Sequence, residues 1–188
     1  SITRDTSSTV KTYCFDINGI NNLKISKVNI YTPDTKNMYA DAAINIENCT
    51  NLQMEDVLIE GTYSRTNNYG YGIQMNNVWN SHFVRLTDHA NWGIFGTNNL
   101  NNTTLRNCDI NRFDIHCYGK DISFKNMEFF DLYNQYASVY GTIRYDNCTF
   151  TNFVPSLNGG SYNAYVAHEI VMNDCVFNAT EKKNFLKI

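Results

Sequence analysis

One short segment gathers residues that could transfer protons. The stretch "NRFDIHCYGKD", residues 111–121, holds Arg112, Asp114, His116 and Tyr118. A histidine gains or loses a proton near neutral pH, a tyrosine hydroxyl can hydrogen-bond a leaving oxygen, and an arginine can stabilise a carboxylate or a developing enolate. These residue types suit β-elimination on a uronic acid, and we predict the four as catalytic candidates. The alternative is that they are ordinary surface residues.

Aromatic and amide side chains form a second group of candidates, suited to binding sugars. Aromatic faces stack on sugar rings, while Asn and Gln amides both donate and accept hydrogen bonds. The predicted substrate-binding residues are Asn45, Tyr71, Gln74, Asn76, Trp92, Phe95 and Tyr140. For the aromatic residues the alternative is that long loops need small hydrophobic clusters of their own.

The composition limits both the fold and the partners. A chain of 188 residues suits one domain with a sizeable core. A formal net charge of -3 gives no electrostatic basis for binding nucleic acid or an anionic membrane, and no run of 18 apolar residues is present. Asparagine is unusually abundant, at 29 residues. Because Asn favours turns and tolerates the left-handed backbone region, we expect many short strands joined by tight corners.

A short phrase of an apolar residue, any residue, a polar residue, Cys or Met, any residue and an apolar residue returns along the chain. Examples are "LRNCDI", "FKNMEF" and "YDNCTF". The spacing between copies is irregular, which indicates a fixed core with loops of different lengths. Seven copies are found, and the second apolar position in each is Ile25, Met54, Phe83, Leu105, Phe124, Tyr145 or Met172.

Each copy predicts two short strands that meet at its polar residue, because apolar residues alternate on both sides of it. Asn107, Asn126, Asn147 and Asp174 occupy that corner in the last four copies, and we call them the Asn ladder. A third short strand precedes each phrase, as in "AINIE" and "GIQMN". The sequence therefore predicts an all-β fold: a right-handed parallel β-helix, or solenoid, of about seven coils stacked ~4.8 Å apart. We expect one domain over residues 1–188, either whole or a fragment of a longer chain.

On this coil pattern and the Asn ladder, the sequence resembles the pectate-lyase-like right-handed parallel β-helix superfamily. The resemblance covers about Tyr13 to Asn178. At the ladder position the first three copies differ, with Lys27, Asp56 and Arg85. Members of the superfamily include polysaccharide lyases, hydrolases, epimerases, phage tailspikes and adhesins, and the fold does not decide among them.

The resemblance implies that a ligand groove lies over the strand that precedes each phrase. Two outward columns of side chains would then line the groove. The first column would contain Asp16, Asn45, Gln74, Phe95 and His116, and the second Asn18, Glu47, Asn76, Thr97 and Tyr118.

Three cysteines fall in one inward column of the predicted coils. Cys108, Cys148 and Cys175 alternate there with valine, leucine and methionine, so we expect reduced thiols that act as small hydrophobic residues. A disulfide between Cys148 and Cys175 is the alternative. No CxxC motif is present, which argues against a metal cluster.

Acidic residues raise two further possibilities. Asp109 and Glu128 fall on adjacent rungs, where a carboxylate pair could hydrolyse a glycoside, or bind Ca²⁺ with Arg106 or Lys125 as a lyase base. Mixed charges on a solenoid exterior usually form a solvated face, and we expect that here. Asp88 falls in register with apolar residues of other coils, so it should be either buried and paired or part of a bulge.

Two classes of function follow. We favour a polysaccharide-recognising module like a tailspike or adhesin, and the main alternative is a polysaccharide lyase or glycoside hydrolase acting in the same groove. A purely structural trimeric shaft is a third reading. Enzyme status stays open. We expect no cofactor, apart from Ca²⁺ in the lyase case, and no metal otherwise. The expected partner is a polysaccharide or cell-surface glycan, with a homotrimer as one assembly. The expected location is extracellular, on a cell surface or on a virion.

Overall fold

The computed structural model is built from β-strands. It describes residues 14–31, 42–60, 71–90, 93–96, 100–110, 113–130, 135–151, 155–156 and 169–178. Within these ranges the backbone alone is described for 95, 114–119, 129–130, 135–141 and 155–156. These ranges contain no helix, and so none that could cross a membrane.

The strands form one large parallel sheet. Every described strand pairing is parallel, from β1 with β3 through to β12 with β15. The strands are β1 (Phe15–Asn18), β2 (Lys24–Tyr31), β3 (Ala42–Thr50), β4 (Gln53–Glu60), β5 (Tyr71–Asp88), β6 (Ile94–Gly96), β7 (Leu100–Arg106), β8 (Asp109–Ile110), β9 (Phe113–Lys125), β10 (Glu128–Phe130), β11 (Gln135–Asp146), β12 (Thr149–Thr151), β13 (Pro155–Ser156), β14 (Glu169–Asn173) and β15 (Val176–Asn178).

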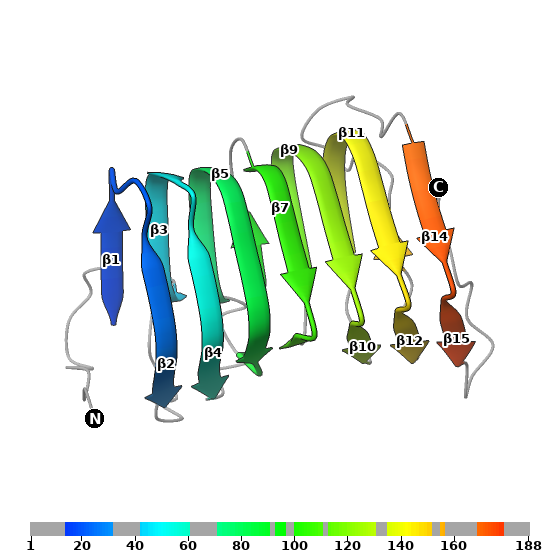
Figure 1. The fold of residues 1–188 in the computed structure, drawn as a ribbon, viewed down its shortest axis with the longest axis horizontal. Coiled ribbons are helices and arrows are strands. Elements are labelled where there is room, and N and C mark those ends of the chain that lie inside the picture. Colours follow the sequence, from blue (N-terminus) through cyan, green and yellow to red (C-terminus); the bar gives the residue numbers. More distant parts are fainter. Residues whose placement is uncertain are drawn as a thin grey trace, which may run out of the picture.

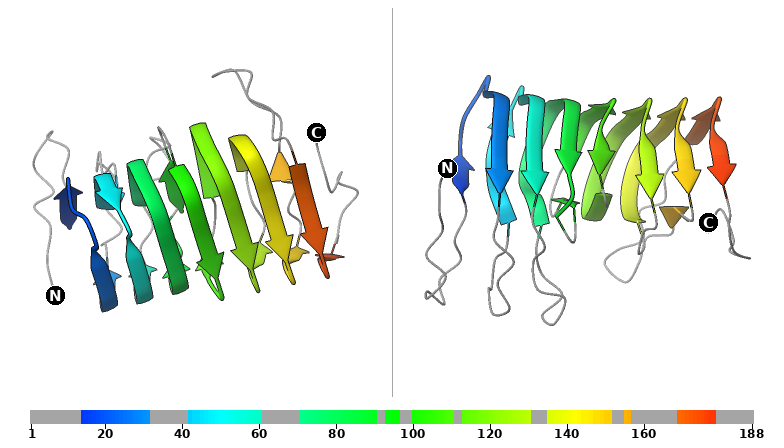
Figure 2. Two further views of the ribbon diagram at one scale, coloured as in Figure 1. Left: turned by 45° about the horizontal axis from the view of Figure 1, so that its top comes forward. Right: turned by 90° about the horizontal axis from the view of Figure 1, so that it is seen from below.

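Three stacks of paired strands run along the long axis of the molecule (Figure 1). Stack A contains β1, β3, β6, β13 and the first parts of β5, β9 and β11. Stack B contains the first parts of β2 and β4, the middle of β5, then β7, β14 and the later parts of β9 and β11. Stack C contains the ends of β2, β4 and β5, followed by β8, β10, β12 and β15. Figure 2 shows the same progression of strands from two other sides. This all-β arrangement is compatible with a parallel β-helix.

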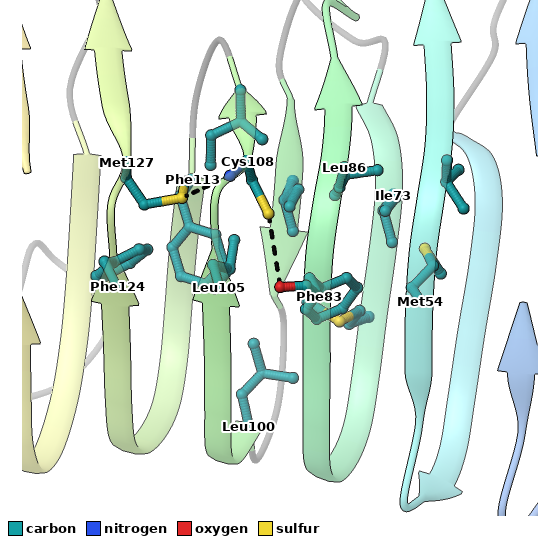
Figure 3. Packing of buried hydrophobic residues seen from close by; sticks show 14 of the residues in the cluster. Met54, Ile73, Phe83, Leu86, Leu100, Leu105, Cys108, Phe113, Phe124 and Met127 are labelled. Carbon is teal, nitrogen blue, oxygen red and sulfur yellow. Dashed lines mark hydrogen bonds between the residues drawn. The ribbon is translucent and has the colours of Figure 1, made fainter. Parts of the chain in front are cut away.

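The predicted stacking of the seven phrase residues is confirmed. Each pairs with the next, in the order Ile25, Met54, Phe83, Leu105, Phe124, Tyr145 and Met172. The rings of Phe124 and Tyr145 stack with centroids 4.9 Å apart. Figure 3 shows such side chains filling the space between strand layers. Because burial of one large apolar side chain contributes about 1.5–3 kcal/mol, this column is a main source of the fold's stability.

The predicted corner of the Asn ladder is also confirmed. Its four residues have φ between 50° and 53°, and Lys27, Asp56 and Arg85 adopt the same left-handed conformation in the first three copies. Asn amides connect successive corners: Nδ2 of Asn126 donates to Oδ1 of Asn107 at 2.9 Å, and Nδ2 of Asn147 to Oδ1 of Asn126 at 3.0 Å. The conformation therefore belongs to every repeat, and the hydrogen-bonded ladder belongs to the later ones.

A second Asn ladder, which we did not predict, lies between stacks A and B. Asn51 and Asn80 have positive φ, and each donates its amide to the equivalent residue of the preceding repeat. Asn102 continues the series by donating to Asn80 at 3.0 Å. The high asparagine content is therefore explained by more than one corner in each repeat.

The described cysteines are free thiols, as predicted, and no disulfide joins Cys148 to Cys175. Cys108 and Cys148 are buried, and burial raises the pKa of each thiol to about 11. The Cys108 thiol lies 3.6 Å from the Phe83 carbonyl, and its backbone N–H contacts the Met127 sulfur at 3.3 Å (Figure 3). These cysteines therefore serve as core residues.

The predicted register of the fifth groove strand is wrong by two residues. Phe95 pairs with Asp114, and His116 does not stand beside it. Phe113 pairs with Ile94 and is buried, with its ring 5.1 Å from that of Phe124. A slip of two residues keeps the same alternation of inward and outward side chains, so hydrophobic pattern alone could not detect it.

Candidate functional site

The outer face of stack A brings together polar side chains from three successive repeats. Asp16 pairs with Asn45 and Asn45 with Gln74, which confirms the first part of one predicted column. Asn18, Glu47 and Asn76 form the second column in the same way. We call these six residues the amide–carboxylate patch. The parallel pairing sets their positions, because equivalent residues on neighbouring strands lie about 4.8 Å apart.

Asn45 joins the two carboxylates of this patch. Its Nδ2 donates to Oδ1 of Asp16 at 2.8 Å and to Oε1 of Glu47 at 3.3 Å. Nδ2 of Asn18 donates to the other oxygen of Glu47 at 3.4 Å. Since one nitrogen contacts both carboxylates, the two bonded oxygens are at most about 6 Å apart, near the separations used by glycoside hydrolases.

The residue that joins the two carboxylates, Asn45, is buried. Asn45 is only 4% exposed, and its Oδ1 has no hydrogen-bond partner among the described residues. Asp16 is exposed and Glu47 is half-buried. A buried amide oxygen without a partner costs free energy, which marks Asn45 as an unusual residue for an outward-facing position. The patch therefore presents two carboxylates that solvent can reach, held in position by one buried amide.

The other predicted binding residues differ in where they lie and in how much of them is described. Gln74 is half-buried and pairs with Phe95, which places the Phe95 backbone beside the patch. Tyr71 is 7% exposed, so its side chain lies mostly within the protein, and its binding role stays a prediction. Tyr140 lies in β11 opposite Lys120, and its side chain is outside the described part. Trp92 lies outside the described residues.

The predicted catalytic group is described only through its backbone. Asp114, His116 and Tyr118 lie in β9, with Asp114 opposite Phe95. Their side chains, and the whole of Arg112, fall outside the described residues. Because Phe95 also pairs with Gln74, Asp114 follows the column that begins at Asp16. Their catalytic roles stay predictions.

The second carboxylate pair lies on a different face. Asp109 and Glu128 are paired on adjacent rungs of stack C, as predicted. Asp109 contacts Nε2 of His89 at 3.0 Å, and both side chains are more than two-fifths exposed. The described residues contain no group of three or more His, Cys, Asp or Glu side chains that could hold a metal ion. This pair matches the solvated face that we expected.

Asp88 is buried in register and is not part of a bulge, although one oxygen of its carboxyl has no partner among the described residues. It pairs with Ile59 on one side and Ile110 on the other, and it is 0% exposed. Desolvation raises the pKa of its carboxyl to about 7, against the opposing effects of the Ala90 N–H and of His89. An apolar column therefore contains one buried acid, without a bulge.

Asp16 and Glu47 were both expected beside the groove, but not as a carboxylate pair. The available signal was the match between "DIN" at 16–18 and "NIE" at 45–47, which lie one repeat apart. Stacking these triplets puts an acid diagonally across from another acid, with an amide between them.

Comparisons with known proteins add no family to this description. No protein-family model matches the chain, and no match was found among curated proteins or among solved structures.

Proposed function

We propose that the chain is a right-handed parallel β-helix of about seven coils, of the pectate-lyase-like type, whose stack A face binds a polysaccharide. Support for the fold comes from the parallel register of the seven phrase residues and from the repeated left-handed corners. A glycan ligand of this kind would place the protein outside the cell, on a cell surface or on a virion.

The observation that carries the binding proposal is the amide–carboxylate patch. Sugar hydroxyls both donate and accept hydrogen bonds, and the patch supplies both kinds of partner over three consecutive rungs. Asn45 holds Asp16 and Glu47 in place before any ligand arrives. Preorganised groups bind more tightly because less conformational freedom is lost on association.

A panel of acidic and neutral polysaccharides tests this function. Binding is measured by calorimetry, and each mixture is then assayed for unsaturated products and for new reducing ends. Binding to one glycan class without products supports the recognition module. Failure of every polysaccharide in the panel to bind at millimolar sugar concentration would refute it.

The bridging of Asp16 and Glu47 by the Asn45 amide favours hydrolysis as a second candidate function. Carboxyl groups about 5–5.5 Å apart act as acid and nucleophile in retaining glycosidases, and the upper limit of about 6 Å set by the Asn45 bridge admits that spacing. In that case Asp16→Asn and Glu47→Gln should each abolish the release of reducing ends while leaving measurable glycan binding. Unsaturated products that disappear in His116→Ala would instead support elimination by the predicted catalytic group.

A further inference from the structure

We propose that Asp88 is a pH-sensitive latch, whose protonated carboxyl joins the two ends of β5 and whose ionisation loosens them. The proposal concerns the conformation of the third repeat and does not depend on the function proposed above. It rests on where the carboxyl lies, what it contacts and what is missing around it.

The location of Asp88 is apolar in the other repeats. The stack C column that contains it is otherwise built from aliphatic and aromatic residues. In order, the described partners are Ile30, Ile59, Asp88, Ile110, Phe129, Phe150 and Phe177. A carboxylate costs far more to bury than an uncharged carboxylic acid, so this position favours the protonated form.

The carboxyl fills the space where Gly72 lacks a side chain. A Cβ added to Gly72 would lie 2.1 Å from each oxygen of Asp88. Gly72 is the second residue of β5 and Asp88 is the last, so this contact closes the strand upon itself. Gly72 also donates its N–H to the Gly93 carbonyl at 2.7 Å, at the point where the chain enters β6. The carboxyl therefore packs at the junction of two repeats.

Within the described residues, only one of the two carboxyl oxygens of Asp88 is hydrogen-bonded. Oδ1 accepts the N–H of Ala90 at 3.1 Å, which fixes the start of the connection to β6. Oδ2 is buried without a hydrogen-bond partner among the described residues. A proton on Oδ2 removes the charge that this oxygen would otherwise carry without compensation.

Within the part of the chain that the structure describes, the ionisable groups around Asp88 do not offset that charge. The residues paired with Asp88, Ile59 and Ile110, are not ionisable, and neither is Gly72. His89 is the described group whose charge acts on the carboxyl, and its Nε2 is engaged by Asp109 at 3.0 Å. Burial therefore outweighs both the His89 charge and the Ala90 hydrogen bond, and the pKa of Asp88 is raised.

The direction of the pH effect follows from this raised pKa. Below about pH 4 the carboxyl is protonated in both the folded and the unfolded chain, so it has no effect on stability. As the pH rises, the unfolded chain loses its proton first, and the folded state is progressively destabilised. The loss is complete above the folded-state pKa of about 7.

Unfolding by urea at several pH values tests the latch. The reference is His89→Gln, which removes the nearest titrating neighbour, and it is compared with the double variant His89→Gln/Asp88→Asn. We expect the unfolding constant of the reference to rise by up to about tenfold per pH unit between about pH 5 and 7. The double variant should lack this rise. Parallel curves for the two proteins would overturn the proposal.

Hydrogen exchange on the unmodified protein gives a second readout that needs no variant. After correction for intrinsic rates, protection of the Gly72, Ala90 and Gly93 amides should fall between pH 6 and pH 8. The backbone N–H of Gln53, which donates to the Leu23 carbonyl of the preceding repeat and lies outside the third repeat, should keep its protection. Equal changes at both places would refute a local latch, even if Asp88→Asn fails to fold.

Discussion

At the scale of single residues, two polar side chains buried in this protein have very different surroundings. Asn45 uses its amide nitrogen to hold two carboxylates, while Asp88 has one oxygen bonded and the other without a partner among the described residues. Both residues lie in regular strands, so neither is explained by a loop or a bulge. Buried polar groups of this kind are costly, which is why they indicate either a function or a specific packing requirement.

Gly72→Ala should be strongly destabilising, because the new methyl group would overlap the Asp88 carboxyl. Overpacking of this kind costs about 1–3 kcal/mol, and we expect the upper part of that range. In an Asp88→Ala background the same change should cost less than about 1 kcal/mol, because the obstructing atoms are gone. Urea unfolding of the four proteins measures the coupling. Additive effects would show that the two residues are not in contact.

Cys108 and Cys148 should resist thiol reagents in the folded protein. Their pKa values of about 11 leave little thiolate at pH 8, and both side chains are buried. We expect labelling at least about a hundredfold slower than in denaturant, read by mass spectrometry. Cys175, which is half-buried at the end of the column, is the internal control and should react sooner. Rapid labelling of Cys108 would contradict its place in the core.

At the scale of elements, the corners decide how strands follow one another. A left-handed residue at the same place in each repeat turns the chain between stacks B and C. Asn serves this corner in two ways, because it tolerates positive φ and its side-chain amide donates a hydrogen bond to the ladder residue of the preceding rung. Lys27 and Arg85 adopt the same conformation without that ladder, so the corner depends on backbone geometry first.

Replacing Asn126 separates the two contributions of a ladder residue. Asn126→Gly can still adopt positive φ and loses only the side-chain hydrogen bonds of the ladder, which should cost about 1 kcal/mol. Asn126→Ala should cost about 1–2 kcal/mol more, since alanine is strained at a φ of 51°. Urea denaturation of the three proteins measures both differences. Equal stability of the Gly and Ala variants would argue against the left-handed corner.

Element order and register were largely predictable from the sequence, and one strand shows where prediction ended. The seven phrase residues stack as expected because alternation fixes which side chains face the core. The fifth groove strand was misplaced because Phe113 and Ile115 satisfy the same alternation as the residues two positions later. Only long-range pairing distinguishes these registers, and a local pattern carries no information about it.

At the scale of the whole molecule, the core and the proposed binding face are built by the same stacking. Inward columns give a continuous apolar core, while outward columns align polar residues that are far apart in the sequence. The amide–carboxylate patch could not be identified from one repeat alone, because its two acids come from different repeats and are diagonal to each other. In the sequence, Asp88 stands out as the one acid in an apolar column. Its contact with Gly72 can be seen only in the folded structure, where the two ends of β5 come together.

The affinity of patch variants for the glycan that the panel identifies tests the central claim most directly. Gln74→Ala and Glu47→Gln alter the outer face of stack A, whereas Gln53→Ala removes an exposed amide from stack B and serves as the matched control. Loss of one or two ligand hydrogen bonds should weaken binding about tenfold in the patch variants and leave the control unchanged. Unaltered binding in both patch variants, or equal weakening in Gln53→Ala, would contradict a glycan site on this face.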